Sequence, residues 1–481
     1  MDFSFTRLAK RSLFPLALGT LALGTLALAS CATEREPTDD PQTAEDDGTV
    51  QALTASVCSG GRWQCKSHVH VDAHNRITPS ATPRGLGPAD LASAYKLDAT
   101  RTSTNTIAIV DAFNYPNAES DLASYRSQFG LPACTKANGC LRVVNQNGAT
   151  SPLPANSPAG DDWTVEAALD LDMASAACPT CKLILIEAND DTSNGLFVAQ
   201  NTAASLGAFV VSDSWGGPSD GTDASLDSQF FTHTQAITTF VASGDSGNTG
   251  ASPDYPSTSL KVVGVGGTHL VKSTTAARGW TETAWSGAGS SCSKLLAKPG
   301  FQTSVVPTAA CSRRAAADVS AVADPNTGLA VFNAGSGGFI VVGGTSAASP
   351  FVAGVWARYG ISGASHDASY PYAHPCELFD VTSGSNGSCT SALCRATTGW
   401  DGPTGLGTPN GASFGKNTTC GTAPPPTCSH LLCSTGAALV SGCNSCATSV
   451  CAADSFCCST SWDSICVGEV TSVCGLSCPG N

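Results

Sequence analysis

Positive charge is scarce in this chain. Only 24 of its 481 residues are Lys or Arg, against 38 Asp and Glu, and the formal net charge is −14. A surface with this balance repels nucleic acid and anionic membranes, so neither is an expected electrostatic partner. Charged residues make up 13% of the chain and hydrophobic residues 42%, which excludes whole-chain disorder. At roughly 100–200 residues per domain, the length fits one large domain and a smaller one.

Long apolar runs are also few, and the clearest lies at the N-terminus. Residues 13–29 are apolar, follow a basic stretch and run into the sequence LASC at 28–31. A small-residue cleavage site directly after the run is typical of a signal peptide, not of a membrane span. The site resembles the lipobox of bacterial lipoproteins, and an ordinary signal peptide with an incidental Cys is the alternative. We therefore expect lipid on Cys31 and export to the outer membrane or cell surface.

Cysteine is abundant, with 23 residues. So many thiols point to an oxidising compartment, because their spacing does not favour metal binding. With Cys31 set aside, an even number remains, and all of these can pair. Local spacing suggests five of the pairs: Cys58–Cys65, Cys134–Cys140, Cys178–Cys181, Cys292–Cys311 and Cys389–Cys394.

Changes in composition divide the chain into five parts. These are a signal peptide (1–30), a lipidated tether with a short N-terminal extension (31–83), a large domain (84–418), a Pro-rich linker (419–427) and a Cys-rich module (428–481). The module holds ten cysteines, and a segment so short needs disulfides to be stable. A zinc ribbon is the alternative, but only Cys443-x-x-Cys446 has the spacing of a zinc knuckle.

Three histidines in the extension, His68, His70 and His74, have a spacing that could bind a metal. Nothing nearby completes a site, so we expect them to be surface residues.

Short β-branched runs alternate with helical stretches in the large domain. The runs are 106–110, 182–186, 208–212, 238–242 and 261–265, and the clearest helical windows are 163–177 and 195–206. Such alternation predicts an α/β fold, with a doubly wound parallel sheet and helices on both faces. Active sites in these sheets lie beyond the carboxyl ends of the strands.

The first strong chemical signal is the run GTSAASP at 344–350. It follows an expected strand at 339–342 and precedes an apolar helical stretch. A Ser at a Gly-rich strand-to-helix turn exposes its hydroxyl at the helix N-terminus, where negative charge is favoured. A helix-capping Ser is the alternative, but the full run makes Ser346 a candidate nucleophile.

A serine nucleophile needs a base. None of the eight histidines lies in the GHGTH-type motif that subtilisins use. Instead, Glu166 and Asp170 lie four residues apart on an expected helix and so share one face. Two carboxylates in contact repel unless a proton lies between them. A solvated acidic face is the alternative, but the neighbours are Ala, Leu, Met and Val.

Glu-x-x-x-Asp followed far downstream by GTSAASP resembles the sedolisin family, the serine-carboxyl peptidases that share the subtilisin fold. The resemblance covers roughly residues 84–418. It implies a peptidase domain in which Ser346 is the nucleophile, Glu166 the general base and Asp170 the group that orients Glu166.

Two further motifs extend the resemblance. SGDSG at 243–247 implies that Asp245 lies in the oxyanion hole, where it donates only when protonated and so implies an acidic working range. The run Ser214-Trp215-Gly216 resembles the strand that binds the substrate backbone, with Trp215 near the catalytic acids.

A calcium site is the last implied feature. The resemblance assigns as ligands of Ca²⁺ the Asp380 and Asp401 side chains and the carbonyls of Val381, Thr397 and Gly399. Oxygen ligands on Gly-rich loops suit the flexible coordination of this ion. A pair of Asx turns without an ion is the alternative.

Two departures from the family pattern bear on function. Sedolisins usually carry a large N-terminal prodomain, whereas only about 50 residues separate Cys31 from the large domain, so self-inhibition is an open question. Asp111 resembles the first-strand Asp of subtilisins and could be a relic, a substrate-site group or part of the charge network.

The expected function is an exported, lipid-anchored and monomeric serine-carboxyl endopeptidase acting on proteins or peptides. A catalytically silent surface protein that uses its Cys-rich module for adhesion is the main alternative. An orthodox Asp-His-Ser peptidase based on Asp111 lacks a credible histidine.

Overall fold

The structure is a computed structural model. It describes residues 52–235, 237–250, 252–361, 368–416, 428–440 and 443–478. The signal peptide, Cys31 and the linker at 419–427 lie outside the described residues, so the predictions about them stay predictions. Within the described ranges, no helix has the length and apolar character needed to cross a membrane.

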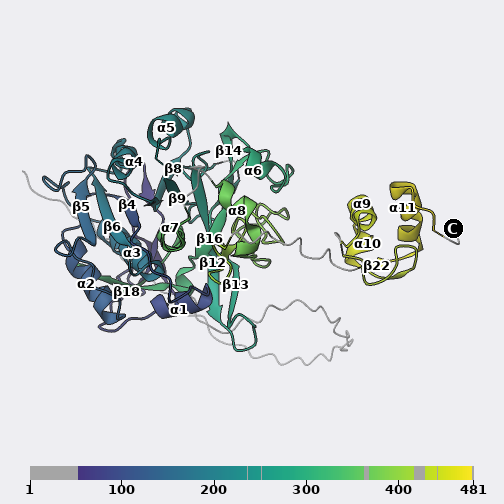
Figure 1. The fold of residues 1–481 in the computed structure, drawn as a ribbon, viewed down its shortest axis with the longest axis horizontal. Coiled ribbons are helices and arrows are strands. Elements are labelled where there is room, and N and C mark those ends of the chain that lie inside the picture. The colour runs from purple at the N-terminus through teal and green to yellow at the C-terminus, as the bar shows by residue number, and fades with distance from the viewer. Residues whose placement is uncertain are drawn as a thin grey trace, which may run out of the picture. The chain divides into compact units, whose positions relative to one another are not determined.

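An eight-stranded sheet forms the centre of the large domain (Figure 1). Its strands are β4 (Thr106–Ala112), β5 (Leu141–Asn145), β6 (Lys182–Ala188), β7 (Val210–Asp213), β9 (Thr238–Ala242), β12 (Val262–Lys272), β13 (Trp280–Ala284) and β16 (Val319–Val322). The order is β13-β12-β9-β7-β4-β6-β5, with β16 also paired to β12. All pairs are parallel except β12 with β13. The α/β prediction is confirmed.

Helices cover both faces of this sheet. On one face α3 (Trp163–Ala177) and α7 (Thr345–Tyr359) pack against each other and on β4. On the other, α4 (Gly195–Ser205) contacts β4 and β6 without packing on α3. All residues of α7 are buried, as expected for a helix without a polar face.

Shorter elements complete the domain. They are α1 (Pro88–Ala94), α2 (Ala118–Gln128), α5 (Asp223–Phe230), β10 (Asn248–Gly250), β14 (Ser290–Ala297), α6 (Gly300–Thr303), β15 (Arg313–Ala315), α8 (Ser369–Ala373), β19 (Leu378–Phe379) and β20 (Thr408–Pro409).

The direction of winding changes between β4 and β7. From β4 the chain crosses to the edge strand β5, returns through β6 and then passes to β7 on the other side of β4. Asp111 and Asp213 lie at the carboxyl ends of β4 and β7, and Asp245 follows β9. Three carboxyl groups therefore meet at the position where open α/β sheets bind their ligands.

The N-terminal extension is part of this fold. Strands β1 (Thr54–Ser56) and β3 (His68–His70) join β17 (Leu329–Asn333) and β18 (Gly338–Gly343) in an antiparallel sheet of order β1-β3-β18-β17. Strand β2 (Gln64–Cys65) pairs with β8 (Trp215–Pro218), whose other edge pairs with β11 (Asp254–Tyr255). The extension is thus ordered because it pairs with strand edges that would otherwise be open.

The pairing of β3 bears on the prediction that the three histidines of the extension are surface residues. His68 and His70 lie on β3 and are half-buried, whereas His74 is exposed as predicted. The surface prediction therefore holds for His74, while His68 and His70 are partly exposed side chains on β3.

The Cys-rich module has a small core of its own around Leu439, Val450 and Trp462. Its elements are β21 (Gly436–Ala437), α9 (Ser445–Ala453), α10 (Phe456–Ser459), β22 (Ser461–Trp462) and α11 (Ser464–Cys474). Its ten cysteines form the disulfides Cys428–Cys443, Cys433–Cys478, Cys446–Cys474, Cys451–Cys458 and Cys457–Cys466. Cys443 and Cys446 pair with different partners, so they do not form a zinc knuckle. The five pairs predicted for the rest of the chain are confirmed.

Candidate active site

Ser346 lies in the first turn of α7, directly after β18. The turn requires Gly344, whose φ is +111°, a conformation that side chains with a Cβ avoid. Ser346 is fully buried, and its hydroxyl donates to the Ser214 carbonyl at 3.0 Å. The Ser346 N–H points out of the helix terminus and donates at 2.9 Å to the carbonyl of Lys66.

Glu166 and Asp170 lie one turn apart on α3 and are both fully buried. Asp170 accepts a hydrogen bond from Ser214 Oγ at 2.8 Å, and Glu166 accepts one from Ser67 Oγ. Burial, reinforced by Asp111, raises the pKa of Glu166, while hydrogen bonding by Ser346 and Ser67 lowers it. Burial and the neighbouring Asp111 and Glu166 likewise raise the pKa of Asp170.

Asp111 belongs to the same group of acids. It is 1% exposed, and neither of its carboxyl oxygens has a hydrogen-bond partner in the described part of the chain. Burial raises the pKa of Asp111, and the charges of Asp213 and Glu187 add to this. A second full charge here has no counter-ion, so the acids must share protons.

Asp245 faces the N-terminus of α7 from the loop after β9. Its Oδ1 accepts hydrogen bonds from the Thr345 N–H and hydroxyl, both at 2.8 Å. Its Oδ2 is buried without a hydrogen-bond partner among the described residues, and His68 Nε2 lies 3.5 Å from it. Burial raises the pKa of Asp245 and His68 opposes this, so a proton on Oδ2 is favoured.

Trp215 and Gly216, predicted to bind substrate, lie on β8. Trp215 is fully buried, and its Nε1 donates to the Val110 carbonyl at 3.0 Å, one residue before Asp111. The backbone of β8 pairs antiparallel with β2 of the extension. Strand β8 is therefore paired, in this structure, with a segment of its own chain.

Residues 62–67 lie against β8 and Ser346, which the sequence reasoning missed. The Lys66 N–H donates to the Ser214 carbonyl at 3.0 Å and to Ser346 Oγ at 2.9 Å. The Lys66 ammonium pairs with Asp254 at 2.7 Å. A lysine beside a small residue, located just before the large domain, is the one signal in the sequence that could have found this segment.

The predicted calcium ligands lie on the loops after β19 and before β20. The Gly399 N–H donates to Asp380 at 2.9 Å, and the Thr397 N–H donates to Asp401 at 3.2 Å. Burial raises the pKa of Asp401 to about 7, and Asp380 adds to the rise. No described Lys or Arg lowers the pKa of either carboxyl, so two acids share a half-enclosed site without a counter-charge. Two carboxyl groups without a counter-charge are compatible with a calcium ion.

A different cluster does not fit a metal. The sulfurs of Cys58 and Cys65 and a Glu166 oxygen lie within 4.8 Å of one another. The two cysteines form a disulfide and have no thiolate to offer.

Comparisons with known proteins agree with this geometry. Residues 155–360 match the subtilase family model, and residues 426–478 match a domain of unknown function, DUF8252. Kumamolisin of a Bacillus species is 33% identical over 363 residues, which are 69% of this chain and 63% of that protein. Sedolisin of a Pseudomonas species is 32% identical over 372 residues, 68% of this chain and 60% of that protein. The chain is a sedolisin homologue.

A solved structure supports the same relationship. Pseudomonas sedolisin, described as a serine-carboxyl proteinase in complex with two molecules of pseudo-iodotyrostatin, superposes with a TM-score of 0.58 at 26% identity. The match covers 70% of this chain and 98% of that one. Against the curated relatives, this sedolisin homologue spans only about 60% of their length.

Proposed function

We propose that this sedolisin homologue is a serine-carboxyl endopeptidase that cleaves proteins and peptides through an acyl-enzyme on Ser346. The observation that carries the proposal is the burial of Glu166 and Asp170 beside Ser346. The Ser346 hydroxyl contacts the backbone of Lys66 and Ser214 and also interacts with Glu166, whose pKa it lowers. No described hydrogen bond joins this hydroxyl to a histidine. The carboxyl group of Glu166 is therefore the available base.

Each group has a defined role in acyl transfer. Ser346 Oγ attacks the substrate carbonyl and passes its proton to Glu166, whose orientation Asp170 fixes. The Ser346 N–H and the protonated Asp245 stabilise the oxyanion. Glu166 returns the proton to the leaving amine, and water then hydrolyses the ester with Glu166 again acting as base.

The two pKa shifts set the direction of the pH dependence. Glu166 must lose its proton to act as base, so activity rises with pH through its raised pKa. Asp245 must keep its proton, so activity falls as pH rises through its own raised pKa. We expect a bell-shaped profile with these two limbs, and we propose an acidic working range because Asp245 must stay protonated.

A serine-directed fluorophosphonate tests the proposal together with digestion of a denatured protein. We expect labelling of Ser346 and digestion between about pH 3 and 7, and loss of both in Ser346→Ala. If neither labelling nor digestion occurs at any pH, the protein is the silent binding protein of the alternative interpretation.

Calcium binding at Asp380 and Asp401 is the second part of the proposal. The carbonyls of Val381, Thr397 and Gly399 would complete an all-oxygen site. When bound, the ion supplies the positive charge that these acids lack and fixes their loops in place.

Export and lipidation of Cys31 are proposed on the sequence alone. The disulfides support them, because such bonds persist only in an oxidising compartment. We expect Cys31→Ser to move the protein from the membrane fraction to the soluble fraction, measured by immunoblotting of fractionated cells. Unchanged fractionation would contradict lipidation. We also propose that the enzyme is a monomer.

A further inference from the structure

The Cys-rich module carries most of the exposed large apolar side chains. In the described part of the chain, six of the eight such side chains lie in this module: Leu431, Val440, Phe456, Ile465, Val473 and Leu476. The other two, Leu53 and Leu295, lie in the much longer stretch before it. Exposed apolar surface that gathers in one part of a soluble protein commonly marks an interaction site.

A disulfide brings two of these side chains together. Phe456 is 43% exposed at the start of α10, and Ile465 is 65% exposed in the first turn of α11. Each directly precedes one cysteine of the bridge Cys457–Cys466, whose Cα atoms lie 5.8 Å apart. The bridge therefore makes the two apolar residues neighbours on the module.

Three acids surround the same bridge. Asp454 accepts the Phe456 N–H at 2.9 Å, and a carboxylate oxygen of Asp454 lies within 4.8 Å of one of Glu469. Asp463 accepts the Ile465 N–H at 2.9 Å. Glu469 follows Ile465 by four residues, so the two share one face of α11. These five residues form the acidic–apolar patch.

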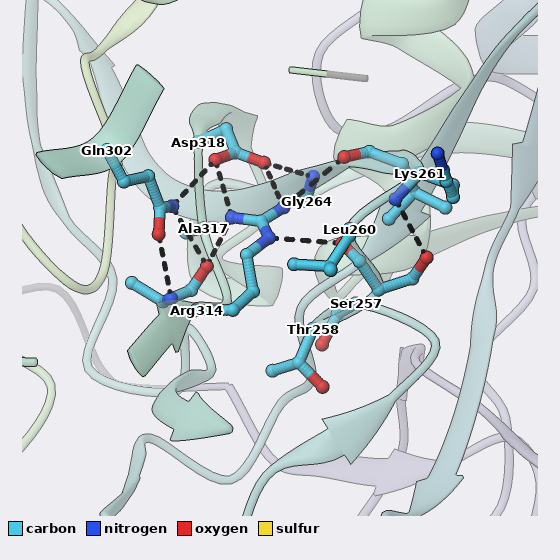
Figure 2. A network of polar contacts seen from close by, with 12 residues as sticks. Ser257, Thr258, Leu260, Lys261, Gly264, Gln302, Arg314, Ala317 and Asp318 are labelled. Carbon is cyan, nitrogen blue, oxygen red and sulfur yellow. Dashed lines mark hydrogen bonds and ion pairs between the residues drawn. The ribbon is translucent and has the colours of Figure 1, made fainter. Parts of the chain in front are cut away.

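The module cannot neutralise these acids with cations of its own. In the large domain a buried acid has a full partner, because Arg314 donates to both carboxylate oxygens of Asp318, at 2.7 and 2.6 Å (Figure 2). The module contains no Lys or Arg at all. Burial, and then the charges of Asp454 and Asp463, raises the pKa of Glu469, as expected for an acid that meets like charges without a counter-ion.

The charge of the patch distinguishes between the possible occupants. A second copy of the module presents the same acids, so two copies repel each other at this surface. An anionic membrane is repelled in the same way. A polypeptide with apolar residues beside Lys or Arg can cover the exposed side chains and also supply the positive charge that the acids lack.

We propose that the acidic–apolar patch is a docking site for basic amphipathic polypeptide segments, in which apolar residues lie beside Lys or Arg. The apolar residues of such a segment cover Phe456 and Ile465, and its cations pair with Asp454, Asp463 and Glu469. Docking requires no cleavage of the segment, so this inference goes beyond the peptidase function and does not depend on it.

Three synthetic peptides of equal length test the chemistry of the partner. One combines Leu with Lys, one Leu with Glu and one Ser with Lys, and each carries a fluorophore. Their binding to full-length Ser346→Ala protein is measured by fluorescence anisotropy near neutral pH, where the patch acids are ionised. We expect the Leu–Lys peptide to bind at least about tenfold more tightly than the other two, and its binding to weaken as salt is added.

Substitutions in the patch locate the site. Ile465→Ser removes an exposed apolar side chain and should weaken binding of the Leu–Lys peptide roughly tenfold. Glu469→Gln should weaken it about three- to tenfold and reduce its salt dependence. The matched controls are Leu295→Ser, which removes an exposed apolar side chain on β14, and Glu119→Gln, which removes an acid on α2. Both controls should bind within about twofold of the Ser346→Ala protein.

Other outcomes overturn the proposal. Equal binding of the Leu–Lys and Leu–Glu peptides would indicate general apolar adhesion, and this ranking decides even if a patch variant does not fold. Unchanged binding by both folded patch variants would place the site elsewhere. Self-association of the protein that Ile465→Ser abolishes would assign the patch to a second copy. Binding to phosphatidylglycerol vesicles that the same substitution abolishes would assign it to a membrane.

Discussion

Asp111 is a buried acid that affects the pKa values of two neighbouring acids. It lies close enough to Glu166 and Asp170 to raise the pKa of both. It is 1% exposed and lies at the carboxyl end of β4. We therefore expect Asp111 to act on the proposed base through its charge.

We expect Asp111→Asn to move the acid limb of the kcat/KM profile to lower pH. Removing the Asp111 charge lowers the pKa of Glu166, so the base becomes ionised in more acidic solution. Turnover at the optimum should stay within about tenfold of wild type, whereas Glu166→Gln should lose roughly 10³-fold or more. Asp170→Asn should fall between them. An optimum above pH 8, with Asp111→Asn inactive and Glu166→Gln active, would return the enzyme to subtilisin-type chemistry.

At the scale of the elements, the loops between β19 and β20 hold two acids whose pKa values are raised by burial. Asp401 is fully buried and accepts from the Thr404 N–H and hydroxyl at 2.9 and 2.8 Å, yet its pKa is still raised to about 7. In the unfolded chain the same group titrates near 3.8. The folded loop therefore favours the proton unless a cation takes its place.

Without Ca²⁺, stability should fall as pH rises from about 4 to about 7. Over this range Asp401 ionises in the unfolded chain but stays largely protonated in the folded chain. This difference lowers the free energy of unfolding by an amount on the order of 4 kcal/mol. Added Ca²⁺ should remove the fall, because it binds the ionised site. The measurement is the thermal midpoint of Ser346→Ala protein, with and without chelator. Asp401→Asn is the control and should not respond to Ca²⁺. An unchanged midpoint after chelation at neutral pH would indicate plain Asx turns.

The strands, helices and local disulfides could be predicted because they follow from short-range patterns. Thr106–Ala112 and Trp163–Ala177 are each contiguous and mostly apolar apart from their acids and a few hydroxyl side chains. The position of residues 62–67 could not be predicted, because it depends on β2 meeting β8 from about 150 residues away in sequence. The ion pair between Lys66 and Asp254 could not be predicted for the same reason.

At the scale of the whole molecule, we expect buried acids to make the fold more stable at acidic pH than at higher pH. Complete burial is the main cause of a raised pKa for several described acids, among them Asp111, Glu166, Asp170, Asp172 and Asp213. Each is protonated more readily in the folded chain than in the unfolded one. Their stabilising contribution is therefore present at low pH and is lost as pH rises through their raised pKa values.

We expect the urea midpoint of Ser346→Ala protein, at constant Ca²⁺, to be higher at pH 4 than at pH 8. Asp172 offers a variant away from the nucleophile, since it accepts the Phe332 N–H at 3.0 Å and an amide oxygen can do the same. Asp172→Asn should reduce the pH dependence while leaving peptide turnover unchanged. A midpoint that rises with pH would contradict this account of the buried acids.

The pairing of β1 with β3 and of β2 with β8 keeps the N-terminal extension tethered beside Ser346. A tethered segment competes at an effective concentration that the connecting chain sets, and not at the concentration of the protein in solution. A peptide that is to pair with β8 must therefore displace this segment, and dilution of the protein does not make that displacement easier.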